Sequence, residues 1–197
     1  MPRPRSLTND QIAAAALAVI DRDGLPALSM RTVAAELDRR TMALYRYVED
    51  REELECLVVD LALGPVLDRA AGREPSPRAR LLALLARMRE AVGAHPGVLP
   101  LAVRHHRTSL PALRWRERIL QALDAAGLDA PARAAALHAL VAYTIGALEV
   151  EHQGPAVTPA PAAFPLLAAA LGTRAATSPS TAFTAGANTV LTGLGIA

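Results

Sequence analysis

The chain has 197 residues, of which 52% are hydrophobic and 3% aromatic, with a formal net charge of +2. This length allows one large or two small domains, and the abundance of alanine and leucine favours helices over sheets. The small net charge excludes a uniformly basic protein, so any nucleic-acid binding depends on where the arginines lie. The single cysteine, Cys56, excludes an internal disulfide framework and suits a reducing cytoplasm.

The sequence shows no pattern typical of export or of membrane insertion. The first ten residues lack the apolar core of a secretory signal, and no uninterrupted apolar run reaches about 18 residues. We therefore expect a cytoplasmic protein without a membrane partner.

The first predicted helix follows an arm at 1–7 that carries Arg3 and Arg5. Thr8 can cap this helix, and Gln11 three residues later completes a capping box. Gly24 is a typical stop signal. Apolar residues at helical spacing form the inner face: Ile12, Ala16, Val19 and Ile20.

Residues 29 to 48 have the pattern of two short helices joined by a tight polar turn. Ser29 can cap the first, predicted over 30–37, because its hydroxyl can accept a hydrogen bond from an unpaired backbone N–H. A polar turn beginning at Asp38 separates it from a second helix predicted over 41–47. Asp38 tolerates left-handed backbone better than most residues do, so it suits the turn.

The two faces of this segment differ in their chemistry. Apolar side chains at helical spacing form the inner face: Val33, Ala34, Leu37, Leu44 and Val48. Tyr45, Arg46 and Tyr47 lie on or near the outside, where hydroxyl and guanidinium groups are available as donors. Donors of this kind bind DNA phosphates and base edges, so the segment predicts a helix that sits in a major groove.

The rest of the chain is predicted to be helical. Asp50 is a good cap for a long helix, whose inner face is predicted to comprise Leu54, Leu57, Val58 and Leu61, and Gly64-Pro65 can interrupt it. A polar turn at 72–78 and a loop at 153–165 divide the remaining residues. Further helices are predicted over 78–94, 97–107, 110–126, 131–152, 166–172 and 180–194.

The first 55 residues resemble the DNA-binding domain of the tetracycline-repressor (TetR) family of bacterial regulators. The resemblance is carried by the capped helix ending at Gly24, by LSMRTVAAEL at 28–37 and by ALYRYVEDREEL at 43–54. The segments HPGVLPLA at 95–102 and ALDAAGLDAPARAAALHALVAYTIGALEVE at 122–151 resemble the ligand-binding domain of the subgroup named for the tetracycline repressor itself.

This resemblance implies an all-α fold with two functional domains. A three-helix helix-turn-helix DNA-binding head would occupy residues 1–50. A long helix would join it to a larger helical ligand-binding and dimerisation domain at 51–197. Asp38 departs from the family, which often has glycine at the start of the turn.

The resemblance also implies DNA-contacting roles for residues of the head. It places Arg31, Thr41, Met42 and Ala43 at base-contacting positions, and an arginine can bind guanine O6 and N7 in a bidentate way. It places a second set at phosphate-contacting positions: Ser29, Thr32, Tyr45, Tyr47 and Arg51. Two alternatives stay open: Tyr45 is a phosphate contact or a packing residue, and Arg39 and Arg40 belong to the interface or to an ordinary solvated turn.

A small-molecule pocket is implied for the C-terminal domain. Its candidate residues are polar side chains on mostly apolar helices: Arg104, His105, His106, Trp115, Tyr143, Glu149 and His152. A mainly apolar pocket with a few polar groups is usual for such a site. Each histidine taken alone is also explained as a surface or satisfied core residue, and Trp115 as a core or interface anchor.

No metal site and no cofactor are predicted. The tetracycline repressor itself binds its drug with magnesium, through a histidine and water-mediated carboxylates. The corresponding carboxylate position falls on Val150 in this chain, between Glu149 and Glu151. This departure from the family argues against tetracycline and against a metal.

The last helices are predicted to form a homodimer. In the family, two helices of each subunit build a four-helix bundle, which requires an apolar face on each. One such face comprises Ala136, Leu140, Tyr143, Ala147 and Val150, and the other comprises Phe183, Ala187, Val190, Leu191 and Leu194. A two-fold dimer would place two recognition helices about 34–36 Å apart, in successive major grooves of a palindromic operator.

These features together predict a ligand-responsive transcriptional regulator. In its simplest form it is a repressor that binds a palindromic operator as a homodimer and is released by a small apolar or amphipathic molecule. The alternative is a ligand-independent helix-turn-helix DNA-binding or protein-interaction module with a fully packed C-terminal core. An enzyme is not expected, since the sequence has no paired-carboxylate motif, nucleophile elbow or phosphate-binding glycine loop.

Overall fold

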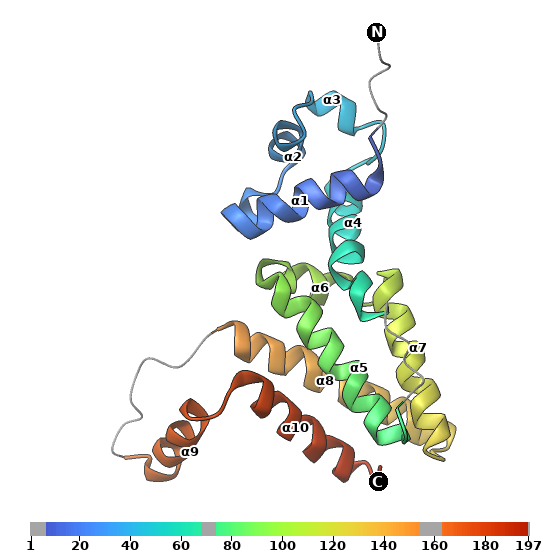
Figure 1. Ribbon diagram of the computed structural model, residues 1–197, viewed down its shortest axis with the longest axis vertical. Coiled ribbons are helices and arrows are strands. Elements are labelled where there is room, and N and C mark those ends of the chain that lie inside the picture. Colours follow the sequence, from blue (N-terminus) through green and yellow to red (C-terminus); the bar gives the residue numbers. More distant parts are fainter. Residues whose placement is uncertain (1–6, 68–73, 154–162, 197) are drawn as a thin grey trace. The chain divides into compact units, whose positions relative to one another are not determined.

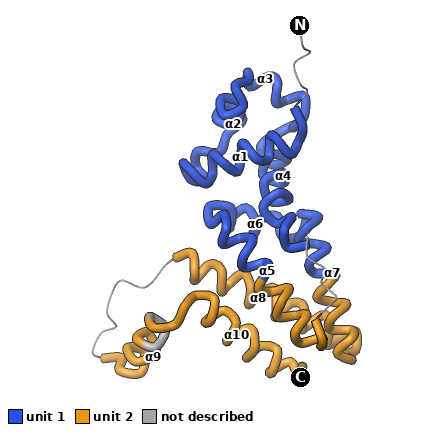
Figure 2. The backbone as a smooth tube through the Cα atoms, viewed as in Figure 1, with its two compact units in different colours: residues 1–70, 87–117 blue, residues 71–86, 118–197 orange. Residues whose placement is uncertain are grey.

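The computed structural model describes residues 7–67, 74–153 and 163–196, and within these ranges the regular elements are all helices (Figure 1). The chain divides into two compact units, residues 1–70 with 87–117 and residues 71–86 with 118–197 (Figure 2). The predicted arm residues Arg3 and Arg5 and most of the predicted loop at 153–165 lie outside the described residues. The functional boundary predicted between residues 50 and 51 stays a prediction.

The first helix, α1 (Asn9–Asp23), begins and ends as its sequence predicts. The Thr8 hydroxyl accepts a hydrogen bond from the Gln11 backbone, and the Gln11 side chain accepts one from the Thr8 backbone. The chain leaves the helix at Gly24, whose φ of 83° is unfavourable for a residue with a side chain. The predicted inner face is buried: Ile12, Ala16, Val19 and Ile20.

Three more helices follow α1 in the first unit, and two of them pack directly on it. A short 3-10 helix (Leu25–Ala27) leads into α2 (Met30–Glu36), and α3 (Thr41–Leu44) follows the turn. Both α2 and α4 (Arg51–Leu63) pack on α1, and α3 packs on α2. The core that these helices share is apolar and fully covered: Ile12, Leu28, Val33, Leu44, Val48, Leu54 and Val58.

The predicted inner face of α4 is partly wrong. Leu61 is 37% exposed and Leu57 is half-buried, whereas Glu55, Val59 and the pair Ala62 and Leu63 are buried. The reason is that α4 packs on α1 and also on α6 (Leu99–His105), so its covered surface is wider than one stripe. A second partner for the helix is not visible in the periodicity of its own sequence.

A close backbone approach joins α1 to the segment before α6. A 3-10 helix (Pro96–Val98) lies against α1, and a Cβ on Gly97 would meet the Ile20 side chain at 2.8 Å. Beside it, the Nδ1 atom of His95 lies 2.7 Å from a carboxylate oxygen of Asp21. Two long helices continue from one unit into the other, α5 (Pro77–Ala94) and α7 (Leu110–Ala125).

The second unit is organised around α8 (Ala130–His152) and α10 (Pro179–Gly193), which pack on each other. Asp129 caps α8 and Ser178 caps α10. Arg78 of α5 fixes the end of α10 through the Asn188 side chain (2.9 Å), the Thr192 hydroxyl (3.1 Å) and the Ile196 carbonyl. The intervening helix α9 (Pro165–Ala175) exposes Leu166 and Leu167.

Helix α8 bears on the expectation that no segment of the chain is apolar enough to span a membrane. Its 23 residues include a window with a mean hydropathy of 1.2, which is long and apolar enough to cross a membrane by length and composition alone. Counting uninterrupted apolar runs missed this window, because single polar residues such as His138 and Thr144 divide it. Only 22% of the window is buried within the chain, so most residues of this apolar window are at least partly exposed to solvent.

Candidate nucleic-acid interface

The start of α2 is fixed by a pair of hydroxyl side chains. Ser29 Oγ accepts a 3.1 Å hydrogen bond from the Thr32 backbone, and Thr32 Oγ1 accepts one of 3.0 Å from the Ser29 backbone. The Thr32 hydroxyl in turn lies 2.8 Å from the Ala27 carbonyl, to which it donates. The Thr32 hydroxyl proton is therefore used within the head, and the Ser29 hydroxyl can donate its own proton to Thr32 Oγ1, which lies 2.9 Å away.

The turn after α2 uses an aspartate in the left-handed region. Asp38 has a φ of 52°, and no other non-glycine residue of the described chain has a positive φ. The Arg39 N–H donates to the Ala34 carbonyl at 2.8 Å, and the Asp38 N–H donates to the Ala35 carbonyl at 3.1 Å. This pair of bonds is the Schellman motif that commonly ends a helix, and it confirms that Asp38 suits the turn.

Helix α3 presents one apolar and one open face, as predicted. Leu44 and Val48 are buried, which anchors the helix on the core of the head. Met42 is 73% exposed and Tyr45 is 48% exposed. Regular α-helix ends at Leu44 rather than 47, although the Tyr47 and Val48 N–H groups still bond to its carbonyl. The open face is therefore short, and its first turn is the part that can enter a groove.

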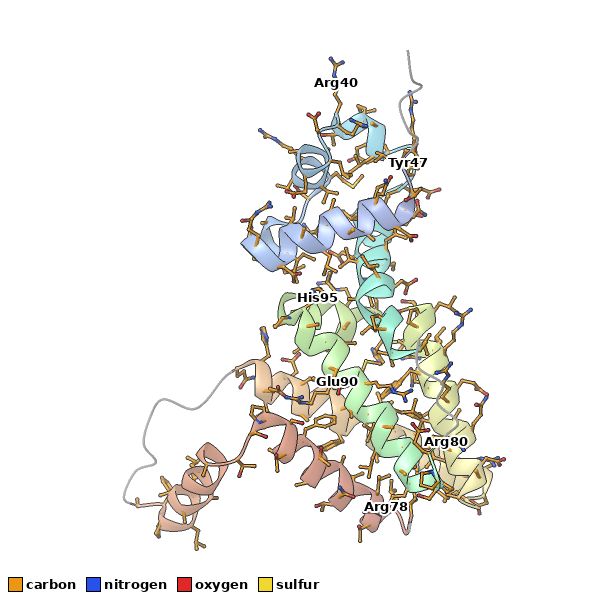
Figure 3. The ribbon with its side chains drawn as sticks, viewed as in Figure 1. Arg40, Tyr47, Arg78, Arg80, Glu90 and His95 are labelled. Atoms are coloured by element: carbon orange, nitrogen blue, oxygen red, sulfur yellow. The ribbon has the colours of Figure 1, made fainter. Side chains whose placement is uncertain are left out.

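The charged side chains around α3 separate into paired and open groups. Glu36 pairs with Arg22 at 2.9 Å, and the Asp50 carboxylate caps α4 through the Glu53 N–H. Four exposed arginines around α3 form no ion pair within the described residues: Arg31, Arg39, Arg40 and Arg46. Arg40 extends away from the head in Figure 3. Asp38 and Glu49 are exposed acids that form no ion pair within the described residues, so among the unpaired side chains around α3 the positive charges outnumber the negative ones.

Arg51 is hydrogen-bonded to the buried carboxylate of Glu55. Glu55 accepts a 2.9 Å hydrogen bond from Arg51 Nε, and its other oxygen accepts a 2.8 Å bond from Arg104 Nη1. Nε2 of the buried His105 lies 3.3 Å from that second oxygen. The Cys56 sulfur lies 3.5 Å from the other ring nitrogen of His105. A single carboxylate thus joins the start of α4 to the end of α6.

Opposing effects set the protonation of this cluster. Burial raises the pKa of Glu55, but hydrogen bonds from Arg51 and His105 and the charge of Arg104 outweigh burial and lower the pKa below its ordinary value. Burial, followed by the nearby carboxylates of Asp60 and other acids, raises the pKa of the Cys56 thiol. Glu55 is therefore ionised and Cys56 is a protonated thiol at neutral pH.

Glu55 is the residue of this surface that the sequence analysis missed. A signal for it exists: Glu55 precedes Val58, Val59 and Ala62 at helical spacing, so it lies on an apolar face. A carboxylate at such a position needs partners once it is buried. Those partners, Arg104 and His105, are about 50 residues away in the sequence and cannot be inferred from local pattern.

The residues predicted to line a ligand pocket are divided between the two compact units. In the first unit, Arg104 and His105 are bound to Glu55, and His106 Nδ1 lies 2.7 Å from the Val103 carbonyl. Trp115 is buried. In the second unit, the Tyr143 hydroxyl donates to the Phe183 carbonyl at 2.5 Å, Glu149 is half-buried and His152 is exposed. A ligand contact by any of these residues stays a prediction.

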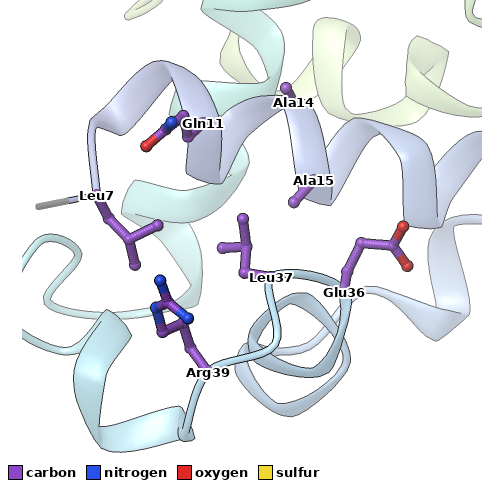
Figure 4. A pocket seen from close by; sticks show the side chains of 7 residues that line it. All are labelled: Leu7, Gln11, Ala14, Ala15, Glu36, Leu37 and Arg39. Carbon is purple, nitrogen blue, oxygen red and sulfur yellow. The ribbon is translucent and has the colours of Figure 1, made fainter. Parts of the chain in front are cut away.

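A shallow groove of about 480 Å³ lies on the head between α1 and the turn after α2 (Figure 4). Leu7, Ala14 and Leu37 give it an apolar floor. Its polar side chains are engaged elsewhere: Gln11 caps α1, Glu36 pairs with Arg22, and Arg39 bonds the Asp38 carbonyl. None of the predicted pocket residues lines this groove, so it is not the predicted ligand site.

The residues predicted for a dimer interface are partly covered within the chain. Leu140, Phe183 and Leu191 are buried where α8 packs on α10, and the Tyr143 and Phe183 rings are 5.4 Å apart. The remaining candidates, Ala147, Val190 and Leu194, are half-buried. Four exposed apolar residues of α8 share another face: Ala135, Ala142, Gly146 and Val150.

Comparison with known proteins gives consistent matches. A family model described as "Tetracyclin repressor-like, C-terminal domain" matches residues 73–196. The HTH-type transcriptional repressor DrrR1 of Streptomyces coeruleorubidus and an HTH-type transcriptional regulator of Saccharopolyspora erythraea are each 34% identical over 146 residues. The matches cover 74% of this chain but 54% and 61% of the relatives, so the chain spans little more than half of their length.

Solved structures resemble the chain over nearly its whole length. A possible TetR family transcriptional regulator from Streptomyces coelicolor has a TM-score of 0.84 and 26% identity, covering 95% of this chain and 98% of that one. Apo ActR from Streptomyces coelicolor has a TM-score of 0.80 and 25% identity, covering 98% and 96%. ActR in complex with actinorhodin has a TM-score of 0.80 and 25% identity, covering 97% and 96%.

Proposed function

Because this chain belongs to the tetracycline repressor-like family, we propose that it is a ligand-responsive transcriptional regulator that binds duplex DNA through α2, α3 and the start of α4. The observation that carries the proposal is the contrast between the buried Leu44 and Val48, which anchor α3 and the residues after it, and the exposed Met42 within α3. Arg40 directly precedes α3 and Arg31 lies on α2, which packs on α3; both are exposed and form no ion pair among the described residues. This arrangement fits a helix held rigidly against a DNA groove.

The head residues take two kinds of role in this proposal. Arg31 reads a guanine, and Met42 and Ala43 make apolar contacts with thymine methyl groups beside Thr41. Phosphates are bound by Ser29, Tyr45, Tyr47 and Arg51, with the backbone around Thr32 supplying the remaining contact. The hydroxyl of Thr32 serves as a helix cap, because its proton is already donated to the Ala27 carbonyl.

A homodimer is the form proposed to bind DNA. The support is the largely uncovered apolar surface of α8, which a soluble chain must cover. The proposed interface combines the half-buried Ala147, Val190 and Leu194 with the open face of α8 at Ala142 and Gly146. Two heads related by a two-fold axis would bind a palindromic operator with recognition helices about 34–36 Å apart.

The proposed signal is a small apolar or amphipathic molecule in a cytoplasmic setting. ActR, which the chain resembles over nearly its whole length, is described in complex with actinorhodin. For release from an operator, the ligand must bind the two conformers of the protein with different affinity. A shift from 1:99 to 99:1 requires a difference of about 5.5 kcal/mol. We propose repression in the free state and release on binding.

The DNA-binding proposal is tested by selection of duplexes from a random library with the full chain. The expected product is a palindrome bound with an affinity that falls steeply with salt, because phosphate contacts release counterions. Arg31→Ala should relax the preference at one base position by about 1–3 kcal/mol. Arg22→Ala is the matched control, since Arg22 belongs to the same head but pairs with Glu36 and Asp23. Binding without salt dependence would contradict the proposal.

The alternative, a ligand-independent module, is separated from the main proposal by the response of the DNA complex. His105 and Tyr143, both predicted ligand contacts, have internal partners, which is the observation that favours this alternative. The selected duplex complex should be titrated with actinorhodin and with a panel of amphipathic compounds. Release of the duplex by any of them supports the regulator, and a complex that none of them disturbs favours the module.

A further inference from the structure

A buried carboxylate connects α6 to the proposed phosphate contact Arg51. Only 4% of the Glu55 side chain is exposed, compared with 53% for Arg51, and one oxygen of Glu55 accepts the Arg51 Nε–H at 2.9 Å. We propose that Glu55 is a positioning residue for DNA binding. It holds the Arg51 guanidinium by Nε, so that the two Nη groups are left for a DNA phosphate. This inference rests on the proposed function.

The geometry of the guanidinium is what makes this role possible. Arginine carries five N–H donors in a planar fork, and binding of Nε to Glu55 fixes the plane of that fork. The bond from Arg51 to Glu55 uses Nε alone, and the Arg51 side chain is half open to solvent. A guanidinium held in one orientation loses less rotamer entropy when it binds a phosphate. Glu55 therefore acts on DNA through Arg51 and does not touch it.

Helix α6 holds the other half of the same carboxylate. Arg104 Nη1 lies 2.8 Å and His105 Nε2 lies 3.3 Å from the second oxygen of Glu55. A buried carboxylate that loses its cations must find other partners, so its side chain would reorient if α6 withdrew. The orientation of Arg51 thus depends on where α6 lies. The contact provides a short physical link from α6 to the DNA surface inside the first compact unit.

The sign of the expected effect distinguishes positioning from simple charge. Glu55→Gln removes a negative charge from a DNA-binding protein, and charge alone would then strengthen binding. Loss of positioning predicts the opposite, because the neutral amide binds the guanidinium less strongly and leaves it mobile. The same substitution therefore gives opposite results under the two explanations.

The test uses the full chain and a fluorescein-labelled duplex of mixed sequence at low salt, because phosphate contacts need no particular base. Glu55→Gln should weaken binding about two- to fivefold, the range of a partly exposed ion pair. It should also reduce the slope of log affinity against log salt by about 0.9, the share of one phosphate. Glu52→Gln is the matched control, since Glu52 is exposed on the same helix; it should leave binding unchanged or tighten it.

Two double-substitution cycles locate the effect. In an Arg51→Met background, Glu55→Gln should cause no further loss of affinity, because the residue that it positions is absent. Arg104→Met should weaken binding in the parent chain and have no effect in the Glu55→Gln background. Arg107→Met removes the same charge from the exposed turn after α6, where no bond to Glu55 is present among the described residues, and should act equally in both backgrounds.

Thermal unfolding checks that each variant is folded. If Glu55→Gln does not fold, Arg104→Met still tests the inference, because Arg104 is exposed and its replacement should not disturb the core. Tighter or unchanged binding by Glu55→Gln overturns the inference, as does equal loss from Arg104→Met in the two backgrounds. Either result leaves the proposed function standing if the parent chain still binds the duplex with a steep salt dependence. Loss of that dependence in the parent chain would instead contradict the proposed function.

Discussion

Asp38 carries the backbone conformation that the helix-turn-helix needs, and it does so without being a glycine. Its φ of 52° lies in the left-handed region, and its N–H closes the end of α2. Left-handed backbone costs most side chains about 1–2 kcal/mol, and aspartate less. Asp38→Ala should therefore lower the free energy of unfolding by about 1 kcal/mol, measured by urea denaturation.

The companion change Asp38→Gly should keep or raise the stability, because glycine adopts this φ without steric cost. Both variants remove the same negative charge from the proposed DNA surface, so both should strengthen binding to a mixed duplex at low salt. Equal stability of the alanine and glycine variants would show that the backbone at Asp38 is not under strain. This comparison separates the backbone effect from the charge effect at one position.

Glu55 should make the stability of the head depend on pH. Its pKa in the folded chain is lowered, after burial has been outweighed by Arg51, His105 and Arg104. A carboxyl whose pKa is lower when folded contributes stability above its unfolded pKa, and loses that contribution as the pH falls below about 4. The unfolding free energy of the parent should therefore fall relative to that of Glu55→Gln as the pH is lowered from neutral to about 3. Urea denaturation at several pH values measures it, and a difference that is constant with pH would contradict the prediction.

At the scale of elements, the contact between α8 and α10 depends on a glycine. A Cβ on Gly186 would lie 2.5 Å from the Tyr143 hydroxyl and 2.9 Å from its ring. That hydroxyl donates to the Phe183 carbonyl, so the ring is held in place. Gly186→Ala should lower the unfolding free energy by about 1–3 kcal/mol through overpacking, measured by thermal or urea unfolding.

Tyr143→Phe gives the control for this contact. It removes the oxygen nearest to the added methyl group, at a cost of about 1 kcal/mol for the lost hydrogen bond. In the Tyr143→Phe background, Gly186→Ala should be less costly than in the parent chain. Gly193→Ala, on the same helix with open space around the glycine, should not destabilise. Equal effects of the two alanine substitutions would exclude a close approach as the reason for Gly186.

The helices of the chain were predictable where the signals are local. Thr8 with Gln11, Ser29 and Asp50 are caps that the sequence displays, and the structure begins helices at each of them. The buried face of α4 was harder to predict, because α4 has two partner helices. Leu61 is exposed and Glu55 is buried for that reason, and neither fact follows from the spacing of apolar residues.

The buried and open sides of α3 could be predicted from local sequence, as the caps could. The internal partners of the predicted pocket residues could not. The open and buried sides of α3 follow from the spacing of Leu44 and Val48 within one short segment. The partners of His105 and Tyr143 come from helices about 50 and 40 residues away, so their internal hydrogen bonds could not be foreseen. Polar residues on apolar helices are equally suited to a ligand and to a partner in the core.

At the scale of the whole molecule, the exposed side of α8 is the strongest indication of self-association. Ala135, Ala142 and Gly146 recur there at helical spacing, and only 22% of the apolar window of the helix is buried in one chain. Small residues let two helices approach closely, and His138 on the same helix disfavours a lipid environment. A second copy of the chain is therefore the partner we expect for this side.

Ala142→Glu should convert the proposed dimer to a monomer. A two-fold interface contains each substitution twice, and burial of an unpaired carboxylate is costly, so the dissociation constant should rise by roughly a hundredfold or more. Sedimentation equilibrium measures it. Ala134→Glu is the matched control, since Ala134 is also exposed on α8 but lies about 80° round the helix from Ala142. The monomer should bind a half-site as tightly as the parent does, but it should bind a palindrome no more tightly than a half-site. That result would show that this face joins the two heads. An unchanged dimer would place the interface elsewhere.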